Sequence, residues 1–152
     1  GEHRFFDTDS GWQSIRAGVG EGVLIGGYSR NFAMMFGSPY FSFDPNADYI
    51  LFIEDHERFS KPDAVSEYLA AIWQHPFMRR VRGFIFGCYN NAGTPPEELV
   101  ALLALIGERY GIPVAYTNDI GHGTRHGVLP MGCRVRLDGG AGTLEFLERT
   151  IL

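Results

Sequence analysis

Two segments of the sequence carry side chains that could do chemistry together. The apolar run Tyr49–Ile53 leads directly into Glu54 and Asp55, and a later glycine-rich segment carries His122 and His126. Catalytic side chains commonly lie on loops held at strand ends. A glutamate beside a histidine can fix the imidazole tautomer and stabilise the imidazolium, which is the orienting and basic half of a nucleophilic triad. Glu54 and His122 are therefore a candidate acid–base pair, although their spacing alone does not bring them together.

Plainer interpretations of the same residues stay open. Glu54 can be a capping or solvated carboxylate, and His122 can be an ordinary turn residue. A metal site is a third alternative, because His122 and His126 are four positions apart and Asp119 is near. That spacing needs a helix, which the surrounding glycines disfavour, and the sequence has no HExxH motif and no cysteine pair at zinc spacing. We therefore predict no metal and no cofactor.

A triad also needs a nucleophile, and the sequence does not identify one. No serine lies in a G-x-S-x-G elbow. Ser29, in GGYSRN, comes nearest, but Arg30 and Asn31 stand where the elbow has a small residue and a glycine. Cys88, in FGCYNN, is either a thiol nucleophile at a strand end or a small buried hydrophobe.

The segments that would position these residues alternate between strand and helix patterns. Strands are expected over Val23–Ile25, Tyr49–Ile53, Val81–Gly87 and Pro113–Tyr116, with a short helix or turn over Phe32–Phe36. Two helices are expected to start with capping residues Ser60 and Thr94, and Gly111 stops the second. A hairpin is expected from Cys133–Leu137 and Thr143–Leu147 around DGGAG. The order predicts an α/β fold with a mixed, partly antiparallel sheet.

Composition limits the partners of the chain. Its 152 residues suit one domain, residues 1–152, and the net charge of −5 gives no footprint for nucleic acid. The single basic cluster, Arg79-Arg80-Val81-Arg82, is interpreted as a solvated helix end. Two cysteines do not make a disulfide framework, and no apolar run is long enough for a membrane span. We expect a cytoplasmic protein without nucleic-acid or membrane partners, and the absence of an initial Met suggests a piece of a longer chain.

Four stretches, in order from about Gly18 to Glu148, resemble the C-terminal domain of the LD-carboxypeptidase family. They are GEGVLIGGYSRNFAMMFGSPYF, ADYILFIEDHE, GFIFGCY and GIPVAYTNDIGHGTRHGVLPMGCRVRLDGGAGTLEFLE. This family of serine peptidases includes murein LD-carboxypeptidases and microcin-immunity peptidases. Its members have a Rossmann-like N-terminal domain with the serine nucleophile, and a swivelling β/β/α C-terminal domain with the glutamate and the histidine.

The resemblance implies a role for each member of the candidate pair. Glu54 matches the glutamate of the family's LFxED motif, and His122 matches the histidine ahead of its LPxG turn. The complete protein would be a cytoplasmic, homodimeric peptidase acting on a murein tetrapeptide or a related amide. This chain would supply two members of a Ser-Glu-His triad and be inactive without the N-terminal domain. If so, we expect an exposed apolar face beside the pair.

The chain also departs from the family pattern. GGYSRN replaces the usual GGN-L, and Arg125 and His126 lie close to the presumed base. Arg125 could meet a substrate carboxylate or be a solvated loop arginine, and a role for His126 stays open. Two alternatives remain. One is a peptide-binding or partner-binding module that uses aromatic residues such as Trp12, Tyr28, Tyr40 and Phe41, and the other is a cysteine hydrolase that uses Cys88, His122 and Glu54.

Overall fold

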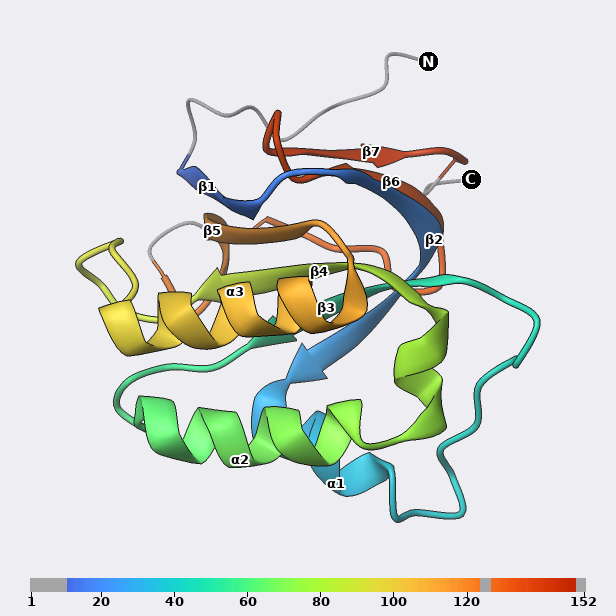
Figure 1. The fold of residues 1–152 in the computed structure, drawn as a ribbon, viewed down its shortest axis with the longest axis horizontal. Helices are drawn as coiled ribbons and strands as arrows, with labels where there is room; N and C mark the ends of the chain where they lie inside the picture. The colour runs from blue at the N-terminus through green and yellow to red at the C-terminus, as the bar shows by residue number, and fades with distance from the viewer. Residues whose placement is uncertain (1–10, 124–126, 150–152) are drawn as a thin grey trace.

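The computed structural model describes residues 11–123 and 127–149. One seven-stranded sheet runs through them in the order β1-β5-β4-β3-β2-β6-β7 (Figure 1). Its strands are β1 (Trp12–Arg16), β2 (Val19–Tyr28), β3 (Tyr49–Glu54), β4 (Val81–Cys88), β5 (Val114–Gly121), β6 (Arg134–Asp138) and β7 (Thr143–Phe146). The helices are α1 (Ser29–Met35), α2 (Pro62–Trp73) and α3 (Glu97–Tyr110), with a 3₁₀ helix η2 (Pro76–Arg80).

The sheet is parallel at its centre and antiparallel at both sides. Strands β2 to β5 pair in parallel, β1 pairs antiparallel with β5, and β6 and β7 extend the sheet antiparallel beyond β2. This arrangement confirms the predicted α/β class with a mixed sheet. The parallel centre also brings the carboxyl ends of β3, β4 and β5 to one edge, which is where the candidate residues lie.

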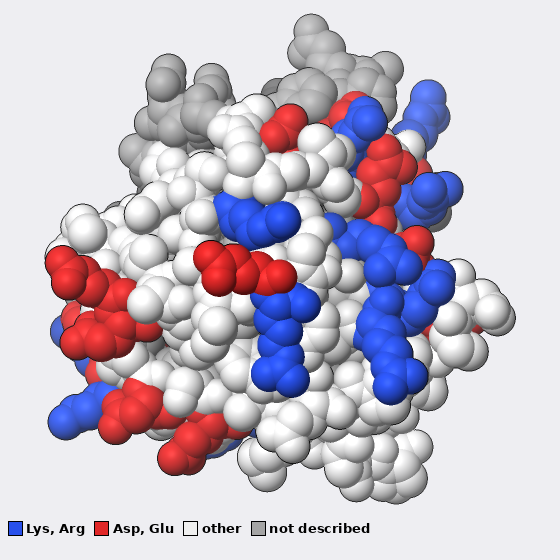
Figure 2. All heavy atoms as spheres, viewed as in Figure 1, with Lys and Arg blue, Asp and Glu red and all other residues white. Residues whose placement is uncertain are grey.

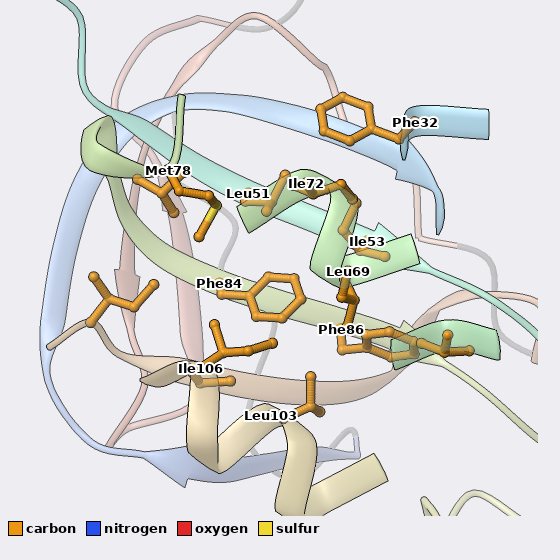
Figure 3. Packing of buried hydrophobic residues seen from close by; sticks show 14 of the residues in the cluster. Phe32, Leu51, Ile53, Leu69, Ile72, Met78, Phe84, Phe86, Leu103 and Ile106 are labelled. Atoms are coloured by element: carbon orange, nitrogen blue, oxygen red, sulfur yellow. The ribbon is translucent and has the colours of Figure 1, made fainter. Parts of the chain in front are cut away.

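Two hydrophobic clusters cover the two faces of the sheet. On the helix-covered face, α2 contributes Leu69 and Ile72 and α3 contributes Leu103 and Ile106, all packed around Phe84 (Figure 3). The opposite face packs alternate strand residues such as Ile50 and Phe52 against β6 and β7. Because side chains alternate between faces along a strand, β3 is buried on both sides, as its continuous apolar run predicts.

Several helix and strand ends differ from the predictions. Strand β5 continues to Gly121, five residues beyond the predicted end, because Cys88 of β4 still pairs with Gly121 there. Neither Ser60 nor Thr94 caps a helix; the capping positions are Lys61 and Pro96, and neither has a side-chain cap. Pro62, in the first turn of α2, has no backbone N–H. The helix start therefore has one fewer donor that a capping side chain would have to satisfy.

One strand was missed from the sequence, whereas one predicted helix end is confirmed. Strand β1 has a mixed WQSIR pattern with no alternation, and its pairing with β5 defines it as a strand. Gly111 does end α3, in the left-handed conformation with φ 65°. No helix in residues 11–123 or 127–149 combines the length and apolar character needed to cross a membrane.

The basic cluster lies at the end of η2 and the start of β4. Arg80 and Arg82 each lie 2.9 Å from the carboxylate of Asp48, which directly precedes β3. Figure 2 shows basic side chains gathered on this side of the molecule with acidic ones among them. The cluster therefore has local acidic partners, in keeping with the interpretation as a solvated helix end.

Candidate active site

The structure brings Glu54 and His122 together at the carboxyl edge of the sheet. Glu54 is the last residue of β3, and His122 directly follows β5. Strand β4 lies between those two strands, yet His122 Nδ1 is 3.4 Å from Glu54 Oε2. The His122 side chain is 37% exposed and the Glu54 side chain 23% exposed, so the histidine is accessible to a substrate and its partner is partly shielded.

Two glycines let the glutamate reach across the middle strand. A Cβ atom on Gly87 of β4 would lie 3.2 Å from Glu54 Cβ and 2.9 Å from the Ile120 carbonyl oxygen. A Cβ on Gly121 would lie 3.1 Å from Glu54 Oε2. Gly121 also has φ 109°, a conformation that residues with a side chain rarely adopt. The contact between Glu54 and His122 therefore requires glycine, without a side chain, at positions 87 and 121.

The orientation of the pair assigns different tasks to the two imidazole nitrogens. Nδ1 faces the Glu54 carboxylate, which leaves Nε2 as the nitrogen available to a substrate or a nucleophile. The distance of 3.4 Å is an ion-pair contact, longer than an optimal hydrogen bond. Catalytic contacts of this kind are commonly longer without substrate and shorten when it binds. The arrangement can hold the imidazole in one tautomer and stabilise its protonated form.

Three aromatic rings surround the imidazole of His122. The ring centroids of Tyr28, His56 and Phe59 lie 5.5, 6.0 and 6.1 Å from it. Phe59 is 69% exposed, and Val128, six residues after His122, is 83% exposed. Of the exposed apolar residues, Phe59 lies beside the pair, with its ring against that of His122.

Asp55 lies beside Glu54 in sequence but points into a different environment. It is fully buried, and its carboxylate accepts hydrogen bonds from the Tyr28 hydroxyl, the Ser29 hydroxyl and the His56 backbone N–H. Asp55 is the first residue after β3, so strand alternation does not predict where its side chain points. The hydrogen-bond partners of Asp55 come from different elements, so the local sequence pattern does not predict them.

The candidate nucleophiles of the sequence lie in poor environments for attack. Ser29 is fully buried, and its hydroxyl donates to Asp55. Cys88 is 2% exposed, its Sγ contacts the Asn90 carbonyl oxygen at 3.2 Å, and burial raises the pKa of its thiol. The uncharged, less nucleophilic thiol is thereby favoured. Within the described ranges, no hydrogen bond joins a serine hydroxyl to His122.

Two other predicted site residues, Arg125 and His126, lie outside the described residues. The metal alternative would have joined His122 and His126 with Asp119. Among the residues that the structure does describe, no group of three or more His, Cys, Asp or Glu side chains is arranged to hold a metal ion.

Comparisons with known proteins agree with this fold and with the motifs. The family model for the LD-carboxypeptidase C-terminal domain matches residues 21–137. A protein of Treponema pallidum (strain Nichols) named "Putative carboxypeptidase" is 32% identical over 139 residues, which are 90% of this chain and 40% of that protein. A Bacillus subtilis (strain 168) protein, "Putative carboxypeptidase YocD", is 25% identical and covers 93% of this chain and 43% of its own.

Solved structures show the same fold. An MccF-like protein from Bacillus anthracis has a TM-score of 0.78 at 24% identity, over 91% of this chain and 43% of its own. A muramoyltetrapeptide carboxypeptidase from Oxalobacter formigenes has a TM-score of 0.72 at 22% identity, over 95% and 48%. The chain thus spans less than half the length of each of these four proteins. With the family model matching most of its residues, the chain belongs to the LD-carboxypeptidase family, in the part that forms the family's C-terminal domain.

Proposed function

We propose that this chain supplies the glutamate and the general base of a serine carboxypeptidase. His122 is the base, Glu54 orients it, and the serine comes from an N-terminal domain. The observation that carries the proposal is the 3.4 Å contact between His122 Nδ1 and Glu54 Oε2, formed across an intervening strand that has glycine at the crossing point. A pair that needs two glycines to form is hard to explain as a solvated strand end.

The reaction follows from the two nitrogens. His122 Nε2 takes the proton of the serine hydroxyl as its oxygen attacks the scissile carbonyl carbon, and Glu54 stabilises the imidazolium. His122 then gives that proton to the leaving amine, and the amide C–N bond breaks. In the second half, a water molecule loses a proton to His122 and hydrolyses the acyl-enzyme. The proton returns to the serine oxygen as the acid product leaves.

The substrate and the partner domain are part of the same proposal. The bond cleaved is an L,D-peptide bond next to a free carboxylate, as in a murein tetrapeptide, and one relative of known structure bears the name muramoyltetrapeptide carboxypeptidase. Phe59 is exposed and its ring lies 6.1 Å from that of His122, so an N-terminal domain that completes the site would cover it. We further propose that this chain forms one domain of the protein, that the complete protein is cytoplasmic and forms a homodimer, and that Arg125 meets the substrate carboxylate.

Hydrolysis of a murein tetrapeptide tests the proposal directly. The chain is assayed alone, with the separately expressed upstream segment, and again with a His122→Asn chain in the mixture. We expect D-alanine release only from the mixture that contains unsubstituted chain. Release of D-alanine by the chain alone would show that this chain contains the nucleophile, which would contradict a serine supplied by the N-terminal domain. Equal release with the His122→Asn chain would remove His122 as the base.

A further inference from the structure

We infer that Tyr28, held by the buried carboxylate of Asp55, is a positioning residue for His122. The inference rests on the proposed function, because it assigns a task to residues around the proposed base. It concerns the position where this chain has GGYSRN, and it explains why a second acid follows Glu54 at the end of β3.

Asp55 places a carboxylate in the interior, where it needs partners. A carboxylate without solvent must be satisfied by protein donors, or its burial costs stability. Three donors meet it: the Tyr28 hydroxyl at 2.9 Å, the His56 N–H at 2.7 Å and the Ser29 hydroxyl. They come from the end of β2, the start of α1 and the segment after β3. Asp55 therefore joins three elements at the carboxyl edge of the sheet.

Two of these three donor residues also contact the ring of His122. The Tyr28 ring meets it edge-on, with centroids 5.5 Å apart and an interplanar angle of 61°. The His56 ring lies 6.0 Å away, and its Nδ1 accepts from the Arg58 N–H, which fixes the orientation of that ring. Asp55 thus anchors two of the three aromatic neighbours of His122, while Glu54 faces its Nδ1.

The pairing of β2 with β3 explains why Tyr28 can take part. Tyr28 lies directly opposite Glu54 in the parallel register, so both side chains leave the sheet on the same face. Two residues earlier, Gly26 allows the β2 backbone to approach β3 closely, since a Cβ there would lie 1.6 Å from the Phe52 carbonyl oxygen. The register and this close approach place the tyrosine ring between the Asp55 carboxylate and the imidazole.

The Tyr28 hydroxyl remains a donor over the range in which a histidine base works. Burial, followed by the hydrogen bond to Asp55, raises the pKa of Tyr28 above its ordinary value, whereas Ser60 and Arg30 oppose that shift. The hydroxyl is therefore protonated at neutral pH. Among residues 11–123 and 127–149, the titratable groups that contact the imidazole are Glu54, His56 and Tyr28.

A pair of conservative variants tests the inference. Tyr28→Phe keeps the ring and removes the donor to Asp55. Tyr49→Phe is the matched control, because the Tyr49 hydroxyl also makes hydrogen bonds, with the backbone of Asp44. Tyr49 begins β3, at the end of the strand away from Glu54 and His122. Both variants lose tyrosine hydroxyl hydrogen bonds, so a general loss of stability should affect them alike.

The readout is the ¹⁵N and ¹H NMR titration of the His122 ring in this chain. We expect Tyr28→Phe to change the midpoint and the tautomer signals of His122, and Tyr49→Phe to leave both unchanged. In the complete protein we expect Tyr28→Phe to lower kcat about tenfold with KM nearly unchanged. A Tyr28→Phe chain whose His122 titrates like the unsubstituted and Tyr49→Phe chains would overturn the inference.

The two proposals fail in different ways. If His122→Asn leaves the complete protein active, the proposed function fails, whereas the NMR result for Tyr28→Phe still decides whether Asp55 and Tyr28 position the ring. If Tyr28→Phe leaves the NMR signals of His122 unchanged, the positioning role of Tyr28 is wrong, and the role of His122 as a base is unaffected.

Discussion

Glu54 crosses the sheet over Gly87: a Cβ on that glycine would lie 3.2 Å from Glu54 Cβ, closer than about nine in ten such contacts in proteins. The crossing carries the carboxylate from β3 past β4 to the imidazole that follows β5. A glycine in the middle of a sheet is unfavourable for stability and commonly marks a place where another group approaches closely. Here the groups that approach are the Ile120 carbonyl oxygen, the Phe52 ring and the Glu54 side chain at its Cβ.

Gly87→Ala should separate the pair without removing either member. The added methyl would also meet the Ile120 carbonyl oxygen at 2.9 Å, so the strands or Glu54 must shift. We expect a loss of about 1–3 kcal/mol in the free energy of unfolding and a kcat at least tenfold lower in the complete protein. Urea unfolding and steady-state kinetics measure the two effects.

Gly37→Ala is the control for that variant. A methyl group added at Gly37 would have no neighbour within 4 Å, and the φ of Gly37 is not positive. The variant should keep full activity and stability within about 0.5 kcal/mol. Full activity of Gly87→Ala would show that the carboxylate does not need this path.

Asp55→Asn tests the buried network through stability. The amide keeps the shape of the side chain but loses the charge, and its NH2 group replaces one acceptor oxygen with a donor, facing either the Tyr28 or the Ser29 hydroxyl. We expect a loss of about 2–4 kcal/mol in the free energy of unfolding, measured by urea titration. Asp63→Asn, at an exposed position in the first turn of α2, should cost less than about 1 kcal/mol. Equal effects would contradict a special role for Asp55.

Cysteine alkylation distinguishes a buried thiol from a catalytic one. Cys88 is buried with a raised pKa, whereas Cys133 is partly exposed. With iodoacetamide at about pH 7.5, Cys133 should be modified at least tenfold faster than Cys88 in the folded chain. Peptide mass spectrometry over time follows both sites. Faster labelling of Cys88 would support the cysteine-hydrolase alternative.

Alkaline pH should destabilise the fold through three tyrosine hydroxyls, those of the buried Tyr89 and Tyr116 and of the partly buried Tyr28. Burial is the largest cause that raises the pKa of Tyr28, Tyr89 and Tyr116, and it raises that of Tyr89 to about 12. Each folded-state pKa lies above the ordinary value of 10.0, so the folded chain holds these protons more tightly than the unfolded chain. Their contribution is complete below about pH 10 and is lost as the pH rises through the folded-state values.

Urea unfolding between about pH 8 and pH 12 measures this dependence. The free energy of unfolding should fall above about pH 10, and Tyr116→Phe should make the fall shallower. A free energy of unfolding that stays flat over the whole range would contradict the raised pKa values of these three hydroxyl groups.

The features that could be predicted from the sequence depend on neighbouring residues, and those that could not depend on contacts between distant segments. Strand β3, with Glu54 at its end, follows from a local apolar pattern, and His122 is identified by its motif; both signals can be read from the sequence alone. The crossing over Gly87 and the task of Asp55 depend on strand register and on partners from three elements. Neither local propensity nor a motif encodes those contacts, and for the same reason β1 and the end of β5 were missed.

The most direct test of the central claim is a double-mutant cycle in the complete protein. Hydrolysis of the murein tetrapeptide is measured for Glu54→Gln, His122→Ala and the variant with both substitutions. If the two side chains act as one unit, each single change lowers kcat by roughly 10³–10⁴, and the double variant is no slower than His122→Ala. Losses that multiply would show two independent contributions, and unchanged rates in either single variant would contradict the account.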